Sequence, residues 1–276
     1  MQQTRRHWFV AGLLALSAVA FGCGSAAPVA VVDDGSTPHD RWLTQGDPVP
    51  NIMVLPTNGV YEPDVLVECG GPPTFPAAAL RAPVLLSESD VADGAMVPLE
   101  EFLASGEGGF WPQDSYWTFI NTDDVLMIVH ISADGAATTL AAERTDSGWM
   151  ATRLATGGSC PIQVPLPEGL GEVGWREDPA TPNEPESTLI ALLATGRDCS
   201  SGHPMGDRLA PPQVVVTDDA IYVALVQYRP TGTQECPGNP EEAVTININE
   251  PRGDRPLINA RTAAGTLADY VPVSPS

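Results

Sequence analysis

The chain has 276 residues, a formal net charge of −22 and 43% hydrophobic residues. This length and hydrophobic content are enough for one large or two modest domains with a buried core. Such an acidic surface repels nucleic acid and anionic lipid headgroups, so we expect no nucleic-acid partner.

The first 22 residues have the pattern of a bacterial lipoprotein signal peptide. Arg5 and Arg6 precede an apolar run over residues 8–21, which is a charged n-region followed by an h-region. The run is too short for a membrane-spanning helix, which needs about 20 residues. It ends in the tetrapeptide AFGC, which resembles a lipobox. We therefore predict lipidation at Cys23, with the protein attached to the outer face of the bacterial cell membrane through this lipid. The alternative is an ordinary secretory signal with a chance cysteine.

The segment after the signal peptide, residues 23–50, is predicted to be a flexible tether because it is small, acidic and proline-containing. Residues 51–160 are predicted to form an α+β domain. Short strands are expected at 51–55 and 65–67, and an irregular turn is expected over residues 69–73, before the segment 75–80. A helix is expected near residues 97–105, because Pro98 suits a first turn and Leu99, Phe102 and Leu103 share one face.

An antiparallel meander is predicted after this helix, with the helix packed on one face. Its strand-like runs are 117–120, 125–132, 136–143 and 149–155. The Asp134-Gly135 pair between two of them is a strong hairpin signal.

The C-terminal half is predicted to be all β. Residues 161–186 are proline-rich and without periodicity, which indicates a long connection. A β-rich subdomain is expected over residues 187–262, followed by a tail over residues 263–276. Its expected strands are 188–194, 213–217, 220–228 and 244–249. The predicted fold class is mainly antiparallel β with minor helix, stapled by disulfides.

Four cysteines remain when Cys23 carries lipid, and in an oxidising compartment they predict two disulfides. They are Cys69, Cys160, Cys199 and Cys236. Three pairings are possible. We favour Cys69 with Cys160 and Cys199 with Cys236, because each pair then joins residues within one half of the chain. The spacing matches neither a zinc ribbon nor a redox CxxC motif, so no metal is expected.

Histidine is scarce, and only three histidines follow the signal peptide. His39 lies in the predicted tether, and His130 lies inside an apolar strand, where a structural role is expected. His203 lies in a loop beside a cysteine and is the best candidate for a site residue. No nucleophile elbow, HExxH, Walker loop or dinucleotide-binding motif is present, so we expect no cofactor. Paired aspartates at strand ends are interpreted as turn residues.

The C-terminal half carries a second resemblance. The run CPGNP, a strand, then EP-x-GDR is similar to the C-terminal signature of exported, often lipid-anchored actinobacterial proteins without an assigned function. The cysteine-containing run CGGPPTFP and the stretch over residues 148–160 resemble earlier parts of that family. The resemblance implies no catalytic residues, and the integrin-type tripeptide RGD at residues 252–254 is interpreted as a coincidence.

Two functional hypotheses follow from these observations. The first is a non-catalytic surface module that binds an envelope protein, a glycan or a small ligand, since the chain has an anchor and no catalytic motif. The alternative is an envelope hydrolase that uses His203 with Asp198 or Asp207 as an acidic partner and Ser200 or Ser201 as a nucleophile. A concave site that joins these residues would favour the hydrolase.

Overall fold

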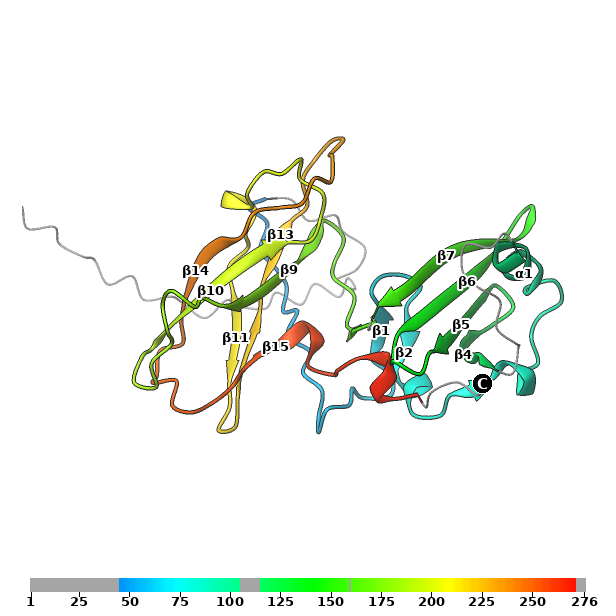
Figure 1. The fold of residues 1–276 in the computed structure, drawn as a ribbon, viewed down its shortest axis with the longest axis horizontal. Helices are drawn as coiled ribbons and strands as arrows, with labels where there is room; N and C mark the ends of the chain where they lie inside the picture. The colour runs from blue at the N-terminus through cyan, green and yellow to red at the C-terminus, as the bar shows by residue number, and fades with distance from the viewer. Residues whose placement is uncertain (1–44, 105–114, 159, 272–276) are drawn as a thin grey trace, which may run out of the picture. The chain divides into compact units, whose positions relative to one another are not determined.

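A computed structural model describes residues 45–104, 115–158 and 160–271. The signal peptide, Cys23, His39 and most of the predicted tether lie outside the described residues. The described chain consists mainly of antiparallel sheets with one short α-helix (Figure 1), which confirms the predicted fold class. Among the described residues, no helix has the length and apolar character needed to cross a bilayer.

The largest sheet is an antiparallel meander in the order β3-β4-β5-β6-β7. The strands are β3 (Val84–Leu85), β4 (Trp117–Asn121), β5 (Val125–Ile131), β6 (Ala137–Thr145) and β7 (Gly148–Gly158). Helix α1 (Val97–Ala104) buries Leu99 in a core with Leu126 and Ile128 of β5. Residues of β5 that point the other way, such as Met127, belong to a different core. The sheet is covered on both faces, and the predicted helix on a meander is confirmed.

A small sheet with the order β2-β1-β8 contributes to the core that contains Met127. Its strands are β1 (Leu66–Cys69), β2 (Phe75–Pro76) and β8 (Ile162–Gln163). Val67 and Phe75 are fully buried in this core, which we call the first core. Within the described residues, the short 3-10 helices η1 (Ala77–Leu80), η2 (Leu86–Glu88) and η4 (Gly206–Arg208) lie between strands, and η5 (Ala260–Thr262) and η6 (Leu267–Asp269) follow β15.

Two further sheets make up the C-terminal half. One has the order β13-β9-β10-β14 and the other β11-β12-β15, with β15 parallel to β12. The strands are β9 (Leu170–Glu177), β10 (Leu189–Gly196), β11 (Gln213–Val216), β12 (Ile221–Ala224), β13 (Val226–Tyr228), β14 (Glu242–Asn247) and β15 (Leu257–Asn259). Ile190 and Leu192 of one sheet share a core with Ile221 and Val223 of the other, which we call the second core.

Both described ends of the chain pack against residues that are distant in sequence. Near the N-terminal end, Val49 packs against a cluster that contains Leu170 and Val226. At the C-terminal end, Leu267 and Val271 belong to the first core. The described parts of the predicted tether and tail are therefore packed rather than free.

Three differences from the predicted elements have local causes. Residues 51–55 form no strand, because the backbone N–H of Ile52 donates to the Gln213 side chain instead of to a ladder. The prediction of an irregular connection over residues 161–186 is wrong for residues 170–177, which form β9. Glycines in this strand interrupt the hydrophobic alternation that would have indicated it. The expected single strand over residues 220–228 divides at Leu225 into β12 and β13, which belong to different sheets.

The two predicted disulfides are present with the favoured pairing. Cys69 and Cys160 have Cα atoms 5.2 Å apart, and Cys199 and Cys236 have Cα atoms 4.6 Å apart. Both distances lie in the usual range for disulfides.

Candidate functional site

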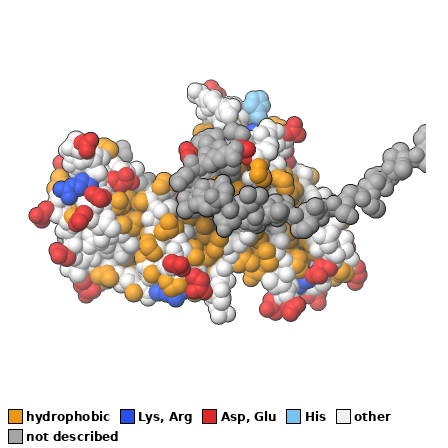
Figure 2. Space-filling model, turned by 180° about the vertical axis from the view of Figure 1, so that it is seen from behind, with side chains coloured by type: hydrophobic (Ala, Val, Ile, Leu, Met, Phe, Trp, Pro, Cys, Tyr) orange, Lys and Arg blue, Asp and Glu red, His pale blue; other side chains and the backbone are white. Residues whose placement is uncertain are grey.

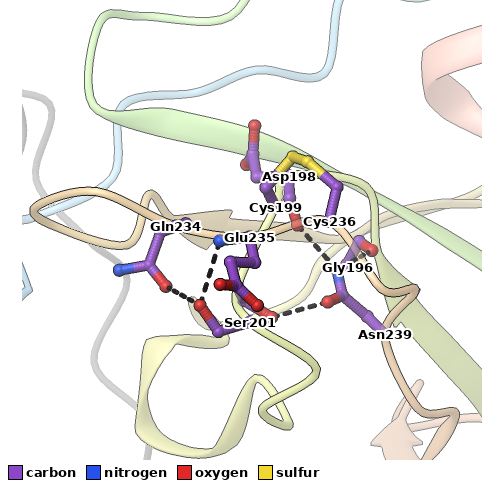
Figure 3. Close-up of a disulfide and its surroundings, with 9 residues drawn as sticks. Gly196, Asp198, Cys199, Ser201, Gln234, Glu235, Cys236 and Asn239 are labelled. Carbon is purple, nitrogen blue, oxygen red and sulfur yellow. Dashed lines mark hydrogen bonds between the residues drawn. A yellow bond between two sulfur atoms is a disulfide. The ribbon is translucent and has the colours of Figure 1, made fainter.

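The loop after β10 carries the residues predicted for a hydrolase site, and a disulfide ties it to a second loop (Figure 3). Cys199 begins this loop, and its partner Cys236 lies in the run of residues 234–239. The hydrogen bonds of each side chain in these loops therefore decide which of them is free to take part in chemistry.

Asn239 joins the two loops through its side-chain amide. Its Nδ2 donates to the backbone oxygen of Gly196 at 2.7 Å and to that of Asp198 at 2.6 Å. Its Oδ1 lies 2.6 Å from the hydroxyl of Ser200, which also lies 2.7 Å from the backbone oxygen of His203. Ser200 is 2% exposed. Its hydroxyl is therefore a buried donor with a structural role, and it is not exposed to a substrate as a nucleophile would be.

Ser201 is used in the same way. Its hydroxyl donates to Oε1 of Gln234 at 3.1 Å and accepts from the backbone N–H of Glu235 at 3.1 Å, as Figure 3 shows. Ser201 has a φ of 54°, a left-handed conformation that a short polar residue tolerates in a turn. The two serines thus hold the loops together.

The His203 side chain is exposed. Its backbone N–H donates to the Ser200 carbonyl at 2.9 Å. Within the described residues, its ring forms no hydrogen bond or ion pair with Asp198, Asp207 or either serine. The structure therefore does not bring the predicted hydrolase residues together, and this geometry weighs against the alternative hypothesis.

Asp198, one of the two acidic partners considered in that hypothesis, belongs to a hydrogen-bond network that the sequence did not indicate. Its Oδ2 accepts from Nε2 of Gln227 at 3.3 Å, and its Oδ1 lies 3.5 Å from Nε of Arg229. Gln227 is fully buried, and its Oε1 accepts from Nη1 of Arg208 at 3.0 Å. These polar groups connect Asp198, which follows β10, to β13 and to Arg208 of η4.

Two glycines make room for this network. A Cβ atom at Gly171 would lie 1.4 Å from Oδ2 of Asp198, and one at Gly196 would lie 2.6 Å from Nε2 of Gln227. Any side chain at position 171 would displace the carboxylate. Glycine inside a strand marks such a close approach, so these glycines were the available signal for the network.

Arg252 of the RGD tripeptide is also engaged within the molecule. Its Nη1 and Nη2 lie 2.8 Å and 3.2 Å from the carboxylate oxygens of Glu177, and 15% of its side chain is exposed. The hydrogen bond from Arg252 lowers the pKa of Glu177 below its ordinary value. The guanidinium is therefore not displayed as a recognition group, in agreement with the interpretation of this tripeptide as a coincidence.

The remaining histidine, His130, is 6% exposed and lies in β5. Its Nδ1 is 3.0 Å from the backbone oxygen of Ser115, and its ring centre is 5.7 Å from that of Tyr116. These contacts are those of a structural histidine.

A surface depression beside the turn between β4 and β5 has a volume of about 550 Å³ and is lined in part by Asp90, Asp93 and Asp123. In the part of the chain that the structure describes, no group of three or more His, Cys, Asp or Glu side chains is arranged to hold a metal ion. Asp123 is exposed in the turn between β4 and β5, which agrees with its interpretation as a turn residue.

Comparisons of the chain with models of known families, with curated proteins and with solved structures found no match. The family resemblance thus rests on its short motifs. Within the structure these motifs have local roles. Asn239 of the first motif joins two loops, and Arg255 of the second donates to the Glu250 carboxylate at 2.6 Å and to the Thr217 carbonyl at 3.1 Å.

Proposed function

We propose that the chain is a lipid-anchored protein of the bacterial cell envelope that binds a ligand without catalysing a reaction. The signal-peptide pattern and the lipobox at Cys23 support the anchor. Two disulfides support an oxidising compartment, because reducing compartments rarely preserve them. The spread of acidic side chains suits a module that stays soluble on a crowded surface.

The observation that carries the non-catalytic part is the use of the loop beside Cys199. The hydroxyls of Ser200 and Ser201 form hydrogen bonds that hold the loops together, and the Asp198 carboxylate accepts a hydrogen bond from Gln227 of β13. The His203 side chain is exposed and, in the described part of the chain, has no hydrogen bond or ion pair with any of them. General-base activation of a serine needs the base within about 2.6–3.2 Å of the hydroxyl. That arrangement is not formed by the described residues.

The anchor is tested by intact mass and non-reducing peptide mapping of the protein from the membrane fraction. We expect a chain that begins at Cys23 and carries two or three acyl chains, since a single chain binds membranes only weakly. The matched variant Cys23→Ala should lack the acyl mass and leave the membrane fraction. An uncleaved chain without acyl groups would contradict the anchoring proposal.

The absence of catalysis is tested separately with ester and amide substrates. The variants His203→Ala and Ser201→Ala should leave any measured turnover unchanged relative to the control His39→Ala. Turnover by the wild type that disappears in His203→Ala but not in His39→Ala would replace the binding module with the hydrolase.

A further inference from the structure

The outer face of the sheet β9-β10-β14 bears a depression of about 250 Å³. Its lining includes Arg176, Leu193, Thr195 and Arg197. Thr195 pairs with Gly174, and Leu193 pairs with Arg176. Residues directly opposite in an antiparallel pair share a face, and Arg197 directly follows β10, so Arg176 of β9 and Arg197 line the same depression.

Arg197 differs from every other arginine side chain in the described residues, because it has no hydrogen-bond or ion-pair partner there. The others donate to carbonyls or side-chain oxygens or form ion pairs, and they are Arg81, Arg144, Arg176, Arg208, Arg229, Arg252, Arg255 and Arg261. The chain has 13 basic and 35 acidic residues. An unpaired guanidinium in so acidic a protein is the unusual feature of this face.

The backbone and the guanidinium of Arg197 each contact strand β9. Its backbone N–H donates to the Glu172 carbonyl at 2.9 Å. A Cβ atom at Gly174 would lie 2.8 Å from its Nη2 and 2.9 Å from its Nε, so the guanidinium rests directly on the glycine. Asp198 and the Cys199 disulfide follow at once along the chain. The guanidinium thus lies over Gly174 at the depression and is exposed, so a ligand there can reach it.

The charges near Arg197 favour a ligand that carries a single negative charge. The carboxylate of Glu241 neutralises Arg176 through two hydrogen bonds of 2.9 Å and 2.8 Å. Glu172 forms no ion pair with Arg197 among the described residues and acts electrostatically on Arg261. Acidic residues outnumber basic ones in the chain, 35 to 13, and the face of the molecule drawn in Figure 2 likewise bears more acidic than basic side chains. A polyanion would be repelled by Glu172, by Glu241 and by this net charge, whereas a single carboxylate matches one guanidinium.

We propose that Arg197, supported by Gly174 and Thr195, binds the carboxylate of a small ligand in this depression. The guanidinium fork supplies two parallel donors to the carboxylate, and Leu193 and the sheet backbone accept the neighbouring part of the ligand. This site deepens the proposed binding function and rests on it for the source of the ligand, which is an acidic sugar or the C-terminus of a peptide.

The test is a ligand-detected NMR titration of the full chain with two carboxylate probes. Glucuronate represents the acidic sugar and N-acetylalanine the peptide C-terminus, and glucose and N-acetylalanine amide are the neutral analogues. We expect binding of at least one carboxylate and not of its neutral analogue. Binding of glucuronate alone identifies a sugar source, binding of N-acetylalanine alone a peptide source, and equal binding a site that reads the carboxylate only.

Three variants decide whether the depression is responsible. Arg197→Gln should raise the Kd at least tenfold. Gly174→Ala preserves the charge and displaces the guanidinium, so it should also weaken binding. Arg144→Gln removes an equal charge elsewhere and should leave the Kd unchanged.

The proposal is overturned if no carboxylate binds, if neutral analogues bind equally, if Arg197→Gln has the wild-type Kd, or if Arg144→Gln weakens binding as much. Circular dichroism of each variant checks that it folds. This result is independent of the anchoring test, which reads the mass of Cys23, and of the turnover test, which reads His203. Failure of either leaves the binding measurement interpretable.

Discussion

Removal of the disulfide between Cys199 and Cys236 tests how the two loops of the candidate site are held. The double variant Cys199→Ala with Cys236→Ala opens a loop of 37 residues, which by chain entropy should lower the free energy of unfolding by about 3.8 kcal/mol at 25 °C. Cys199 is half-buried and Cys236 exposed, so replacing the sulfurs should add little loss of burial. Urea unfolding followed by tryptophan fluorescence and circular dichroism measures the change.

The control for this variant is Ser201→Ala, which keeps the covalent link but removes the two hydrogen bonds of the Ser201 hydroxyl to the second loop. It should cost about 1 kcal/mol, because Glu235 and Gln234 regain water as a partner. A loss below about 1 kcal/mol for the double cysteine variant would refute the chain-entropy reasoning. It would mean that the cross-link removes little conformational freedom from the unfolded chain.

Three further results are expected. Gln227→Leu should lower the free energy of unfolding by about 2 kcal/mol in urea melts, because it leaves a buried charged network short of a donor and an acceptor. Arg252→Ala should cost about 1 kcal/mol at pH 7. Because Arg252 lowers the pKa of Glu177, this contribution is present above the unfolded carboxylate pKa and disappears as pH falls through the folded pKa, so the variant and the wild type should converge in acid. Burial raises the pKa of Tyr61 to about 12. The contribution of this shift to the free energy of unfolding should be complete below about pH 10 and be lost as pH rises towards 12. In an ultraviolet titration, the variant Tyr61→Phe should lack the phenol that ionises last among the described tyrosines.

The sequence predicted the elements whose residues obey a regular period. The strands of the meander alternate or run apolar between Asp-containing turns, and their ends were placed within a few residues. β9 was not predicted, because Gly171 and Gly174 replace the side chains that would have shown its period. A side chain at either position would clash with Asp198 or Arg197. The close packing that requires glycine therefore also removes the hydrophobic alternation by which the strand could have been predicted.

The candidate site was predicted in part. The disulfide pairing followed from sequence separation, because each bond closes within one half of the chain. The direction of His203 was not accessible from residue types, since a histidine beside two serines fits both a triad and a turn. The partners of Gln227 and Asn239 lie across different strands and loops. Such pairings depend on tertiary register, which a single sequence does not encode locally.

The packing of Leu267 and Val271 against Val67 and Phe75 has a consequence for the order of assembly. A chain that emerges N-terminus first, from a ribosome or from an export channel, presents the strands of the first core early and its closing residues last. At about 5–20 residues per second, the delay during synthesis is roughly 10–40 s. The first core can therefore be completed only after residues 267–271 have been made, although most of its strands are made much earlier.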